Sequence, residues 1–487
     1  MLRHLLAVLC SLAGSLCAVA AERPPNVVVI LADDLGYGDI GCYGNKKIKT
    51  PNIDRFATEG TRFTSFYVSQ PVCTASRASL LSGCYANRVS MAGALNHQSK
   101  VGIHAAEKLL PELLKAKGYA TACYGKWHLG DRGPFLPTKR GFDDFAGLPY
   151  SNDNGPLHPT MRDLPALPFY RGTKVIEKDP DQGRFTRRFT DLAVEFVAQH
   201  QHEPFFLYMP HVMPHVPIFA SPEYKGKSFG GVYGDVVEEL DWSVGEVLAA
   251  LKKYDLEKNT LVLFLSDNGP FLSYGTHAGS AGPLREGKLT AFEGGVRVPC
   301  IARWPGKVPA KRTSDEPFMS IDLLPTFCKL SGAENPNLAI DGKDVLPLLL
   351  GEAGAKSPQT AYFFYIGDEL HAVRSGKWKL HVPHDYLTVN GPPGTDGKPA
   401  NYAKMTPEAM SVSGVRGIAS RHGYKVEKTP LALYDLSADI GETVNVAEKN
   451  PQVVKELMVQ VERARADLGD ALTGTKGKGV RPSGVSE

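Results

Sequence analysis

The run N-V-V-V-I-L-A, residues 26–32, is continuous and rich in β-branched side chains, and D-D follows it at 33–34. Such a run is typical of a strand buried on both faces of a parallel sheet, where side chains need not alternate between apolar and polar. We therefore predict a central strand over residues 26–32 whose carboxyl end carries Asp33 and Asp34.

The pattern recurs at Thr260 to Leu265, a second short apolar run that ends in S-D-N-G, residues 266–269. In open parallel sheets, ligands bind outside the carboxyl ends of the strands. Oxygen donors without sulfur or imidazole suit Ca²⁺ or Mg²⁺ rather than Zn²⁺. Either acidic pair alone could simply solvate a loop, but two pairs on similar strands favour a metal site formed by Asp33, Asp34, Asp267 and Asn268.

Helix-like and strand-like segments alternate through the first two thirds of the chain. The helix-like segments are 105–117, 189–200 and 236–253, and the strand-like segments between them are 119–123 and 205–209. Alternation of this kind predicts an α/β fold, in which a large, mostly parallel sheet is sandwiched by helices.

The composition changes after the helix-like segment 321–330. Short strand-like segments at 361–365, 372–374 and 378–382 follow without a clear crossover helix, and an amphipathic segment spans 452–468. These features predict a smaller C-terminal α+β domain with an antiparallel sheet. The expected organisation is a signal peptide at 1–20, a catalytic domain at 21–344, the smaller domain at 345–473 and a disordered tail at 474–487 that is rich in Gly, Lys and Ser.

The first twenty residues have the pattern of a secretory signal: Arg3, an apolar run from Leu5, and A-V-A at 18–20. The run is shorter than the roughly 20 residues that span a bilayer, so stable membrane insertion is not expected. We predict an exported protein, periplasmic or secreted. The net charge of the 487-residue chain is only +3, which argues against nucleic acid as a partner.

Six of the eight cysteines lie beyond the signal segment, without the spacings of a disulfide scaffold or a zinc cluster. Cys73 begins C-T-A-S-R, residues 73–77, and a helix-like run follows it. A helix N-terminus favours an anion, and Arg77, about one turn on, could stabilise an alkoxide and pair with a carboxylate. The alternative is that Cys73 is a buried structural thiol. Without Cys73 an odd number remains, so at least one cysteine should be free.

Three further segments carry candidate site residues. In G-K-W-H-L-G, residues 125–130, Lys126 and His128 share one face if the strand conformation continues, although a solvated lysine and a packed histidine are the alternative. His211 and His215 have the i, i+4 spacing of zinc proteases, but the prolines around them exclude the necessary helix. Both histidines are then loop residues, catalytic or merely exposed. Lys288 precedes a double glycine, Gly294 and Gly295, that predicts a tight turn.

These segments, in this order, resemble the type I sulfatases of the alkaline phosphatase superfamily, most closely arylsulfatase A and N-acetylgalactosamine-6-sulfatase. The matching blocks are A-D-D-L-G-Y-G-D from Ala32, C-T-A-S-R from Cys73, G-K-W-H-L-G from Gly125, P-H-V-P from Pro214, S-D-N-G from Ser266 and G-K-L-T-A-F-E-G-G-V-R-V-P from Gly287. The run G-L-P-Y-S-N-D-N-G-P, residues 147–156, adds Ser151. One departure is Ala75, where proline is more usual.

The resemblance implies a sulfuric ester hydrolase in which Cys73 is oxidised to formylglycine by a formylglycine-generating or anaerobic sulfatase-maturating enzyme. It implies Ca²⁺, with Mg²⁺ as the alternative, bound by Asp33, Asp34, Asp267, Asn268 and the modified Cys73. It places Arg77, Lys126, His128, Ser151, His215 and Lys288 around the sulfate of a small aryl or saccharide ester.

The mechanism that the resemblance implies is an attack of the hydrated aldehyde on sulfur, with Asp267 as the base. His215 or Lys288 would assist the departing alcohol, and His128 would take the proton that precedes release of sulfate.

Two other functions are compatible with parts of the sequence. A phosphodiesterase or phosphonate hydrolase of the same superfamily is the first, although the extra His and Asp ligands of its two-zinc members are not found beside Asp267. The second is an exported carbohydrate-binding protein with an unmodified Cys73. The mass of the peptide that contains Cys73 separates it from an enzyme.

Overall fold

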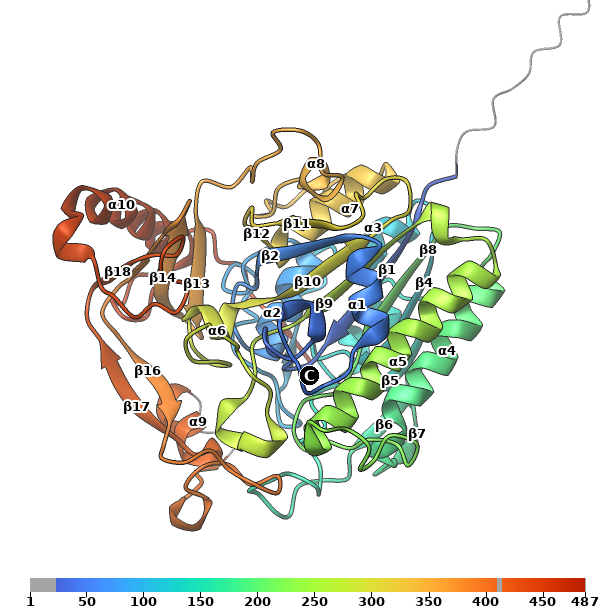
Figure 1. Ribbon diagram of the computed structural model, residues 1–487, viewed down its shortest axis with the longest axis horizontal. Coiled ribbons are helices and arrows are strands. Elements are labelled where there is room, and N and C mark those ends of the chain that lie inside the picture. The colour runs from blue at the N-terminus through green and yellow to red at the C-terminus, as the bar shows by residue number, and fades with distance from the viewer. Residues whose placement is uncertain (1–22, 410–413, 487) are drawn as a thin grey trace, which may run out of the picture.

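The computed structural model describes residues 23–409 and 414–486, so the predicted signal peptide lies outside the described residues. Two sheets organise the chain, a large one in the first part and a small one near the C-terminus (Figure 1). Among the described residues, no helix has both the length and the apolar character needed to cross a membrane. All six cysteines in this part of the chain have free thiols.

The large sheet has eleven strands in the order β11-β2-β10-β9-β1-β8-β4-β5-β6-β7, with β12 also paired to β2. Its centre, from β9 to β5, is parallel, and antiparallel strands β10, β6 and β7 extend it on both sides. In chain order the strands are β1 (Asn26–Ala32), β2 (Thr61–Tyr67), β4 (Ala120–Lys126), β5 (Asp144–Leu148), β6 (Pro168–Arg171), β7 (Lys174–Lys178), β8 (Phe205–Pro210), β9 (Thr260–Ser266), β10 (Arg297–Arg303), β11 (Arg312–Ser314) and β12 (Phe318–Met319).

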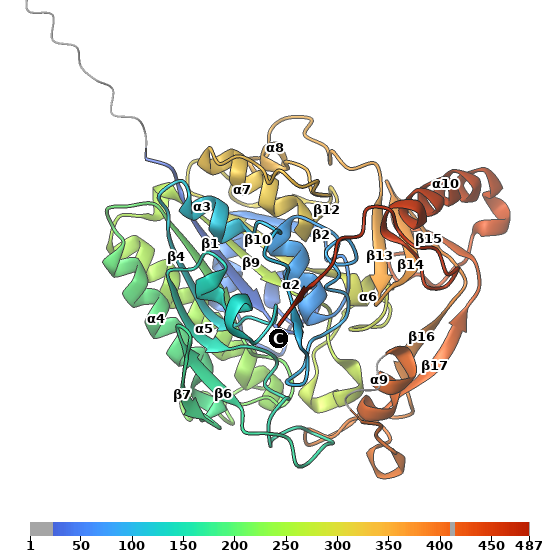
Figure 2. The same ribbon diagram turned by 180° about the vertical axis from the view of Figure 1, so that it is seen from behind.

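Strand β1 is buried on both faces, as its continuous apolar run predicts. Val27 and Val29 belong to one hydrophobic cluster and Val28 and Ile30 to another, because successive side chains of a strand point to opposite faces. The sheet therefore separates two cores, and helices cover both (Figures 1 and 2).

Helices α1, α4 and α5 pack on one face of the large sheet, and α2, α3 and α7 pack on the other (Figure 2). The α/β prediction is thereby confirmed, although α3 is shorter than the segment 105–117 that was expected. The helices of this region are α1 (Pro51–Thr58), α2 (Cys73–Ser82), α3 (Leu110–Lys115), α4 (Phe185–Gln199), α5 (Gly231–Lys253), α6 (Glu293–Val296) and α7 (Leu323–Ser331).

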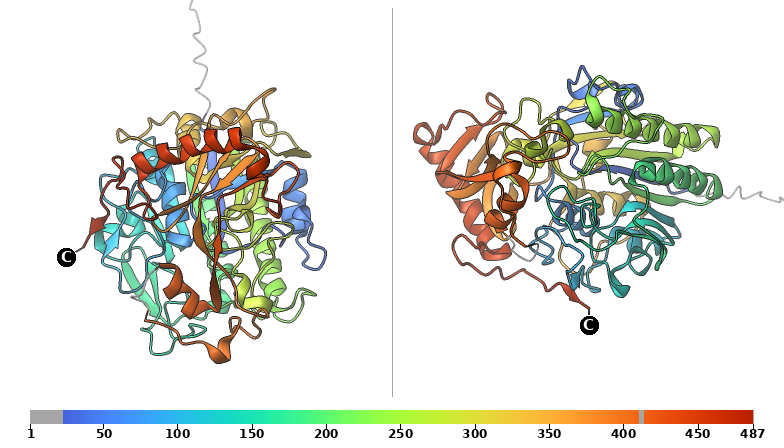
Figure 3. Two further views of the ribbon diagram at one scale, coloured as in Figure 1. Left: turned by 90° about the vertical axis from the view of Figure 1, so that its left-hand side faces the viewer. Right: turned by 90° about the horizontal axis from the view of Figure 1, so that it is seen from below.

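A four-stranded antiparallel sheet in the order β13-β14-β15-β18 forms the C-terminal domain, with α10 lying against it (Figure 3). The two-stranded ribbon β16–β17, beside α9, was not predicted. Helix α8 (Leu346–Leu349) lies beside α7, before the small sheet begins. The later elements are β13 (Tyr362–Ile366), β14 (Glu369–Ser375), β15 (Trp378–His381), β16 (His384–Val389), α9 (Gly414–His422), β17 (Tyr424–Thr429), β18 (Ala432–Asp435) and α10 (Pro451–Leu468).

The tail after Gly474, which was expected to be disordered, instead runs back to the first domain (Figure 3). Its strand β19 (Gly484–Val485) pairs with β3 (Val101–Gly102), and Arg481 forms an ion pair with Glu107 at 2.6 Å. The polar composition suggested disorder, but these contacts with a distant segment order the described part of the tail.

Three buried histidines stack in the C-terminal domain. The ring centroids of His371 and His384 are 3.7 Å apart, and those of His384 and His381 are 5.6 Å apart. Burial lowers the pKa of His371 to about 3, against the opposing influence of Asp470, and burial also lowers the pKa of His384 to about 2. The folded state therefore holds these rings neutral, whereas the unfolded chain protonates them below a pH of about 6.5.

His371→Phe should make the protein less sensitive to acid. Protonation of the unfolded chain costs the wild type about 2 kcal/mol of unfolding free energy per such histidine between pH 6.5 and 5, and phenylalanine removes this cost. Denaturant unfolding should be measured at pH 7.5 and pH 5. Between these pH values the unfolding free energy of the variant should fall by about that amount less than the unfolding free energy of wild type, and His384→Phe should show the same difference. Parallel pH profiles for wild type and variants would show that the rings already titrate in the folded protein.

Candidate active site

The carboxyl ends of β1 and β9 bring the two predicted acidic pairs together. The strands are parallel neighbours, and Ala32 pairs with Ser266, so the residues that follow leave the sheet at the same level. The Asp34 amide donates to Asp267 Oδ1 at 3.1 Å, and Asn268 Nδ2 donates to Asp34 Oδ1 at 2.7 Å. The sheet thus gathers all four side chains at one buried point.

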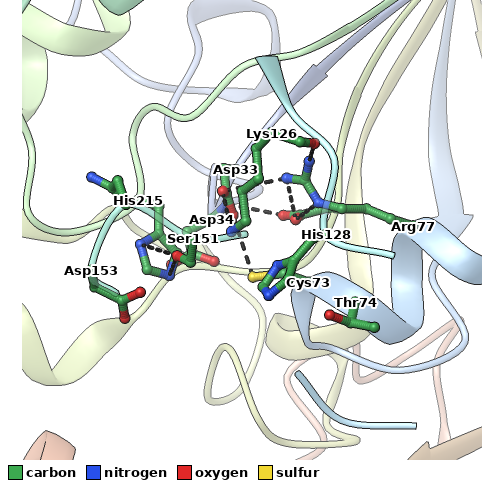
Figure 4. Close-up of polar contacts among 12 residues, drawn as sticks. Asp33, Asp34, Cys73, Thr74, Arg77, Lys126, His128, Ser151, Asp153 and His215 are labelled. Atoms are coloured by element: carbon green, nitrogen blue, oxygen red, sulfur yellow. Dashed lines mark hydrogen bonds and ion pairs between the residues drawn. The ribbon is translucent and has the colours of Figure 1, made fainter. Parts of the chain in front are cut away.

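Cys73 is the first residue of α2, and Val72 before it has an extended backbone conformation. Its Sγ lies 3.5 Å from Asp33 Oδ1 and 3.5 Å from Lys288 Nζ, and the residue is only 2% exposed (Figure 4). Burial, followed by the negative charge of Asp33, raises the pKa of the thiol to about 12. An unmodified Cys73 is therefore protonated at neutral pH.

Arg77 lies one turn along α2 and connects the two strand ends. Its Nη2 is 2.8 Å from Asp267 Oδ2 and 3.3 Å from Asp33 Oδ2, and Nη1 donates to the Lys126 carbonyl at 2.6 Å. Burial would lower the pKa of Arg77, but these carboxylates outweigh burial and raise it. Both Asp267 oxygens are thus engaged, one by Arg77 and one by the Asp34 amide.

Two lysines from separate segments complete the charge balance. Lys126, the last residue of β4, places Nζ 2.6 Å from Asp33 Oδ2, and Lys288 places Nζ 2.7 Å from Asp34 Oδ1. Burial would raise the pKa of Asp33, but Lys126 and then Arg77 lower it below its usual range. Three cations consequently face three carboxylates, including Asp267, whose pKa rises to about 7 because of burial and the nearby Asp33.

The sequence suggested that His128 and Lys126 share one face of a strand. They do not, because the backbone of His128 adopts a left-handed φ of 66°. Its side chain nevertheless lies near the charged cluster, where burial and then the charge of Lys126 lower its pKa well below the usual range. The ring Nε2 is 2.7 Å from the Leu95 carbonyl, and the buried Nδ1 has no partner among the described residues. A carbonyl can only accept, so Nε2 carries the hydrogen and Nδ1 presents a lone pair.

The two loop histidines separate in the fold. His215 Nε2 lies 3.7 Å from Asp34 Oδ2, and the ring lies 3.4 Å from Ser151 Oγ. His211 instead lies 3.2 Å from Ser243 Oγ on α5, and burial lowers its pKa to about 4. His211 is therefore a packing residue outside the site, whereas His215 and Ser151 lie within it.

The double glycine has a different function from the predicted tight turn. Gly294 and Gly295 lie within the short helix α6. The carbonyl of Gly294 is so near the segment after Asn268 that a Cβ at Gly269 would lie 1.8 Å from it. A Cβ at Gly294 would lie 2.0 Å from the Glu286 carbonyl oxygen, and a Cβ at Gly295 would lie 2.1 Å from the Thr290 carbonyl oxygen. Close approach of backbones, rather than turn geometry, therefore explains all three glycines.

The donor chemistry fits a hard divalent cation. Asn268 Oδ1 is buried without a partner among the described residues, and the Asn268 amide lies against the carboxylate of Asp34. Potential ligand atoms of Asp33, Asp34, Cys73 and His215 lie within 4.8 Å of one another. Asp33, Asp34 and Cys73 belong to the predicted set of metal ligands, and His215 is an addition to it. Asp267, which was also predicted as a ligand, forms an ion pair with Arg77.

Two nearby features were missed. Asp153 lies close to Ser151 and His215 (Figure 4), and the block at 147–156 already contained it. The second feature comes from the C-terminal domain. His422 approaches the site, with its ring 5.0 Å from Phe271, and no local sequence signal marks it.

Residues 25–333 match the family model described as "Sulfatase", and residues 357–480 match the "C-terminal region of aryl-sulfatase". Residues 287–380 also match "N-sulphoglucosamine sulphohydrolase, C-terminal". The chain is 39% identical to arylsulfatase A of Homo sapiens over 93% of this chain and 90% of that protein. It is 41% identical to N-acetylgalactosamine-6-sulfatase of Canis lupus familiaris over 76% and 74% of the two chains.

Solved structures show the same architecture. The PsFucS1 sulfatase from Pseudoalteromonas sp. superposes with a TM-score of 0.77 at 27% identity, over 91% of this chain and 90% of that chain. Ps i-CgsB, solved in complex with k-i-k-neocarrahexaose, gives a TM-score of 0.71 at 28% identity, over 91% and 92%.

Proposed function

This chain belongs to the sulfatase family and is a sulfuric ester hydrolase, and we propose that Cys73, converted to formylglycine, is its reacting group. The observation that carries the proposal is the position of Cys73. Its Sγ lies at the first turn of α2, within 3.5 Å of both Asp33 Oδ1 and Lys288 Nζ. A reacting group there lies next to the residues at the carboxyl ends of β1 and β9 and next to the cationic side chains of the site.

Asp33, Asp34, Asn268 and the modified residue 73 would hold Ca²⁺ or Mg²⁺, with Asp267 beside them. The bound cation would polarise a sulfate oxygen and acidify a coordinated hydroxyl. Hydrated formylglycine supplies two hydroxyls on one carbon, one to attack sulfur and one whose deprotonation expels the product.

The chain's own residues then divide the proton transfers. Arg77 holds Asp267 and Asp33 in fixed orientations through its fork of donors, and Asp267 would accept the proton of the attacking hydroxyl. Lys126, Lys288 and Ser151 provide donors for sulfate oxygens, as the family resemblance also implies. His128 Nδ1, whose lone pair faces the site because Nε2 donates to Leu95, accepts the proton that precedes release.

The departing alcohol receives its proton from Lys288 in this scheme. Lys288 Nζ lies 3.5 Å from Cys73 Sγ. His215 Nδ1 is 2.5 Å from the Val216 carbonyl and must donate to it, so its Nε2 is an acceptor unless the ring is charged. His215 therefore positions substrate in this assignment.

For the natural substrate we propose a sulfated saccharide. The relatives include an N-acetylgalactosamine-6-sulfatase, and the neighbour Ps i-CgsB was solved in complex with k-i-k-neocarrahexaose. We further propose that residues 1–20 direct export to the periplasm or medium and that a maturating enzyme oxidises Cys73.

Hydrolysis of 4-nitrophenyl sulfate should exceed that of bis(4-nitrophenyl) phosphate by at least about 100-fold, because the site presents one cation position rather than a two-metal clamp. Release of nitrophenol from both esters, measured with the purified protein, checks this expectation.

Chelation followed by addition of Ca²⁺ serves as the companion measurement. Sulfate ester hydrolysis should disappear and return, because in this proposal the cation held at Asp33 and Asp34 polarises the sulfate and acidifies the attacking hydroxyl. Faster phosphodiester cleavage, or hydrolysis indifferent to chelation, would contradict the assigned chemistry.

A further inference from the structure

Among the site residues, Ser151 and Lys288 are the least buried. Arg77 and Lys126 are 0% exposed, Cys73 is 2% exposed, and Ser151 and Lys288 are each 4% exposed. Beyond them Asp153 is half-buried, and Figure 4 shows it beside His215 and Ser151, on the side away from Arg77. A sulfate ester that reaches Cys73 from solvent therefore carries its alcohol portion past Asp153.

Asp153 has acceptor capacity to spare. Asn154 Nδ2 donates to its Oδ1 at 3.0 Å, and the described residues provide no hydrogen bond to its Oδ2. Burial would raise the pKa of Asp153, but the histidines His215 and His158 lower it, so the side chain is an ionised carboxylate. An ionised acceptor that is half-exposed and only partly bonded is suited to a ligand hydroxyl.

His158 provides a donor near this carboxylate. Its Nδ1 accepts the backbone amides of Thr160 at 3.1 Å and Met161 at 3.0 Å. The neutral ring must then carry its hydrogen on Nε2. That Nε2 is buried, since the residue is only 1% exposed, and it has no hydrogen-bond partner within the described part of the chain. An unpaired buried donor destabilises the protein, and a bound ligand that accepts its hydrogen bond removes that cost.

We propose that Asp153 and His158 bind hydroxyl groups of the saccharide that carries the sulfate, and so determine specificity for a neutral sugar. Asp153 Oδ2 accepts from one hydroxyl, and His158 Nε2–H donates to a hydroxyl oxygen, which is the pairing that neighbouring sugar hydroxyls offer. The negative charge of Asp153 repels a uronate or a second sulfate in this position. The inference rests on the proposed sulfatase function of the site and concerns only its leaving-group side.

The test compares wild type with Asp153→Asn and His158→Asn on two substrate classes. One is 4-nitrophenyl sulfate, which has no sugar hydroxyls, and the other is a panel of sulfated neutral monosaccharides, from which the best substrate is chosen. Asparagine at 158 keeps an acceptor near the position of Nδ1 for the loop amides while removing Nε2. It therefore tests the donor without dismantling the loop.

Each variant should lose about 10–100-fold in kcat/KM on the saccharide, mainly through KM, because one charge-assisted hydrogen bond or one buried donor loses its partner. On 4-nitrophenyl sulfate each should stay within about 3-fold of wild type. Asp153→Asn should also improve turnover of a sulfated uronate, since the repelling charge is gone.

Equal losses on both substrates would overturn the assignment, because they would place the residues in the sulfate chemistry. Unchanged saccharide kinetics would overturn it as well. If wild type hydrolyses 4-nitrophenyl sulfate but no neutral saccharide sulfate, the subsite is wrong while the proposed function stands. If it hydrolyses no sulfate ester at all, the proposed function fails with it.

Discussion

Cys73→Ala is expected to lower sulfate ester turnover by at least about 10⁴-fold, the scale of loss when a nucleophile is removed. The thiol is the precursor of the proposed reacting group, and no other cysteine lies among the site residues described here. The fold should survive, because Cys73 Sγ makes only two polar contacts, both at 3.5 Å, and removing so small a side chain costs about 1 kcal/mol.

Steady-state hydrolysis of 4-nitrophenyl sulfate and a thermal melt measure these two expectations. Cys328→Ala is the matched control, since Cys328 is an equally buried thiol on α7, away from the site. Cys73→Ser should release at most one equivalent of alcohol, because a serine sulfate ester has no second hydroxyl to expel the sulfate. Full turnover by Cys73→Ala, or an unmodified thiol in the peptide of an active preparation, would refute the formylglycine assignment.

Lys288→Met is expected to lower kcat for a saccharide sulfate by about 10²–10³-fold. It should lower kcat for 4-nitrophenyl sulfate by only about 10-fold. A sugar alcohol is a poor leaving group and needs a proton, whereas nitrophenolate leaves without one. The part of the loss common to both substrates reports the contact between Lys288 Nζ and Asp34, and the difference reports proton donation.

The measurement is kcat of wild type and Lys288→Met on both substrates. Lys252→Met, which changes an exposed lysine on α5, is the control. Thermal melts are needed alongside, because the variant leaves buried Asp34 without its closest cation, and this costs stability. Equal losses on both substrates would remove Lys288 from the role of acid and leave it as a sulfate or Asp34 partner.

The core of the fold was predictable because its signals are local. The apolar runs at 26–32 and 260–265 became the neighbouring buried strands β1 and β9. Helices α4, α5 and α10 lie where the periodicity indicated. Strand β10 and the ribbon β16–β17 were not predicted, because antiparallel pairing to distant segments leaves little trace in a short stretch of sequence.

The site was partly predictable for the same reason. Asp33 and Asp267 end strands of a recognisable type, and Cys73 begins a recognisable motif. Segments without regular structure were harder. Loop position does not distinguish His215, which enters the site, from His211, which packs against α5, and only the resemblance of the P-H-V-P block selected His215. His128 was assigned to the right region for the wrong reason, since its left-handed backbone departs from the expected strand.

The order of residues along the chain was enough to establish a doubly covered parallel sheet, acidic strand ends and a cysteine at a helix start, because strand and helix periodicities are properties of neighbouring residues. Only the folded chain decided that Arg77 bonds to Asp267, that Lys288 reaches Asp34, that the tail docks on the first domain and that His422 approaches the site. These contacts join segments separated by many residues, and their energies depend on burial and charge that arise only when the sheet has assembled.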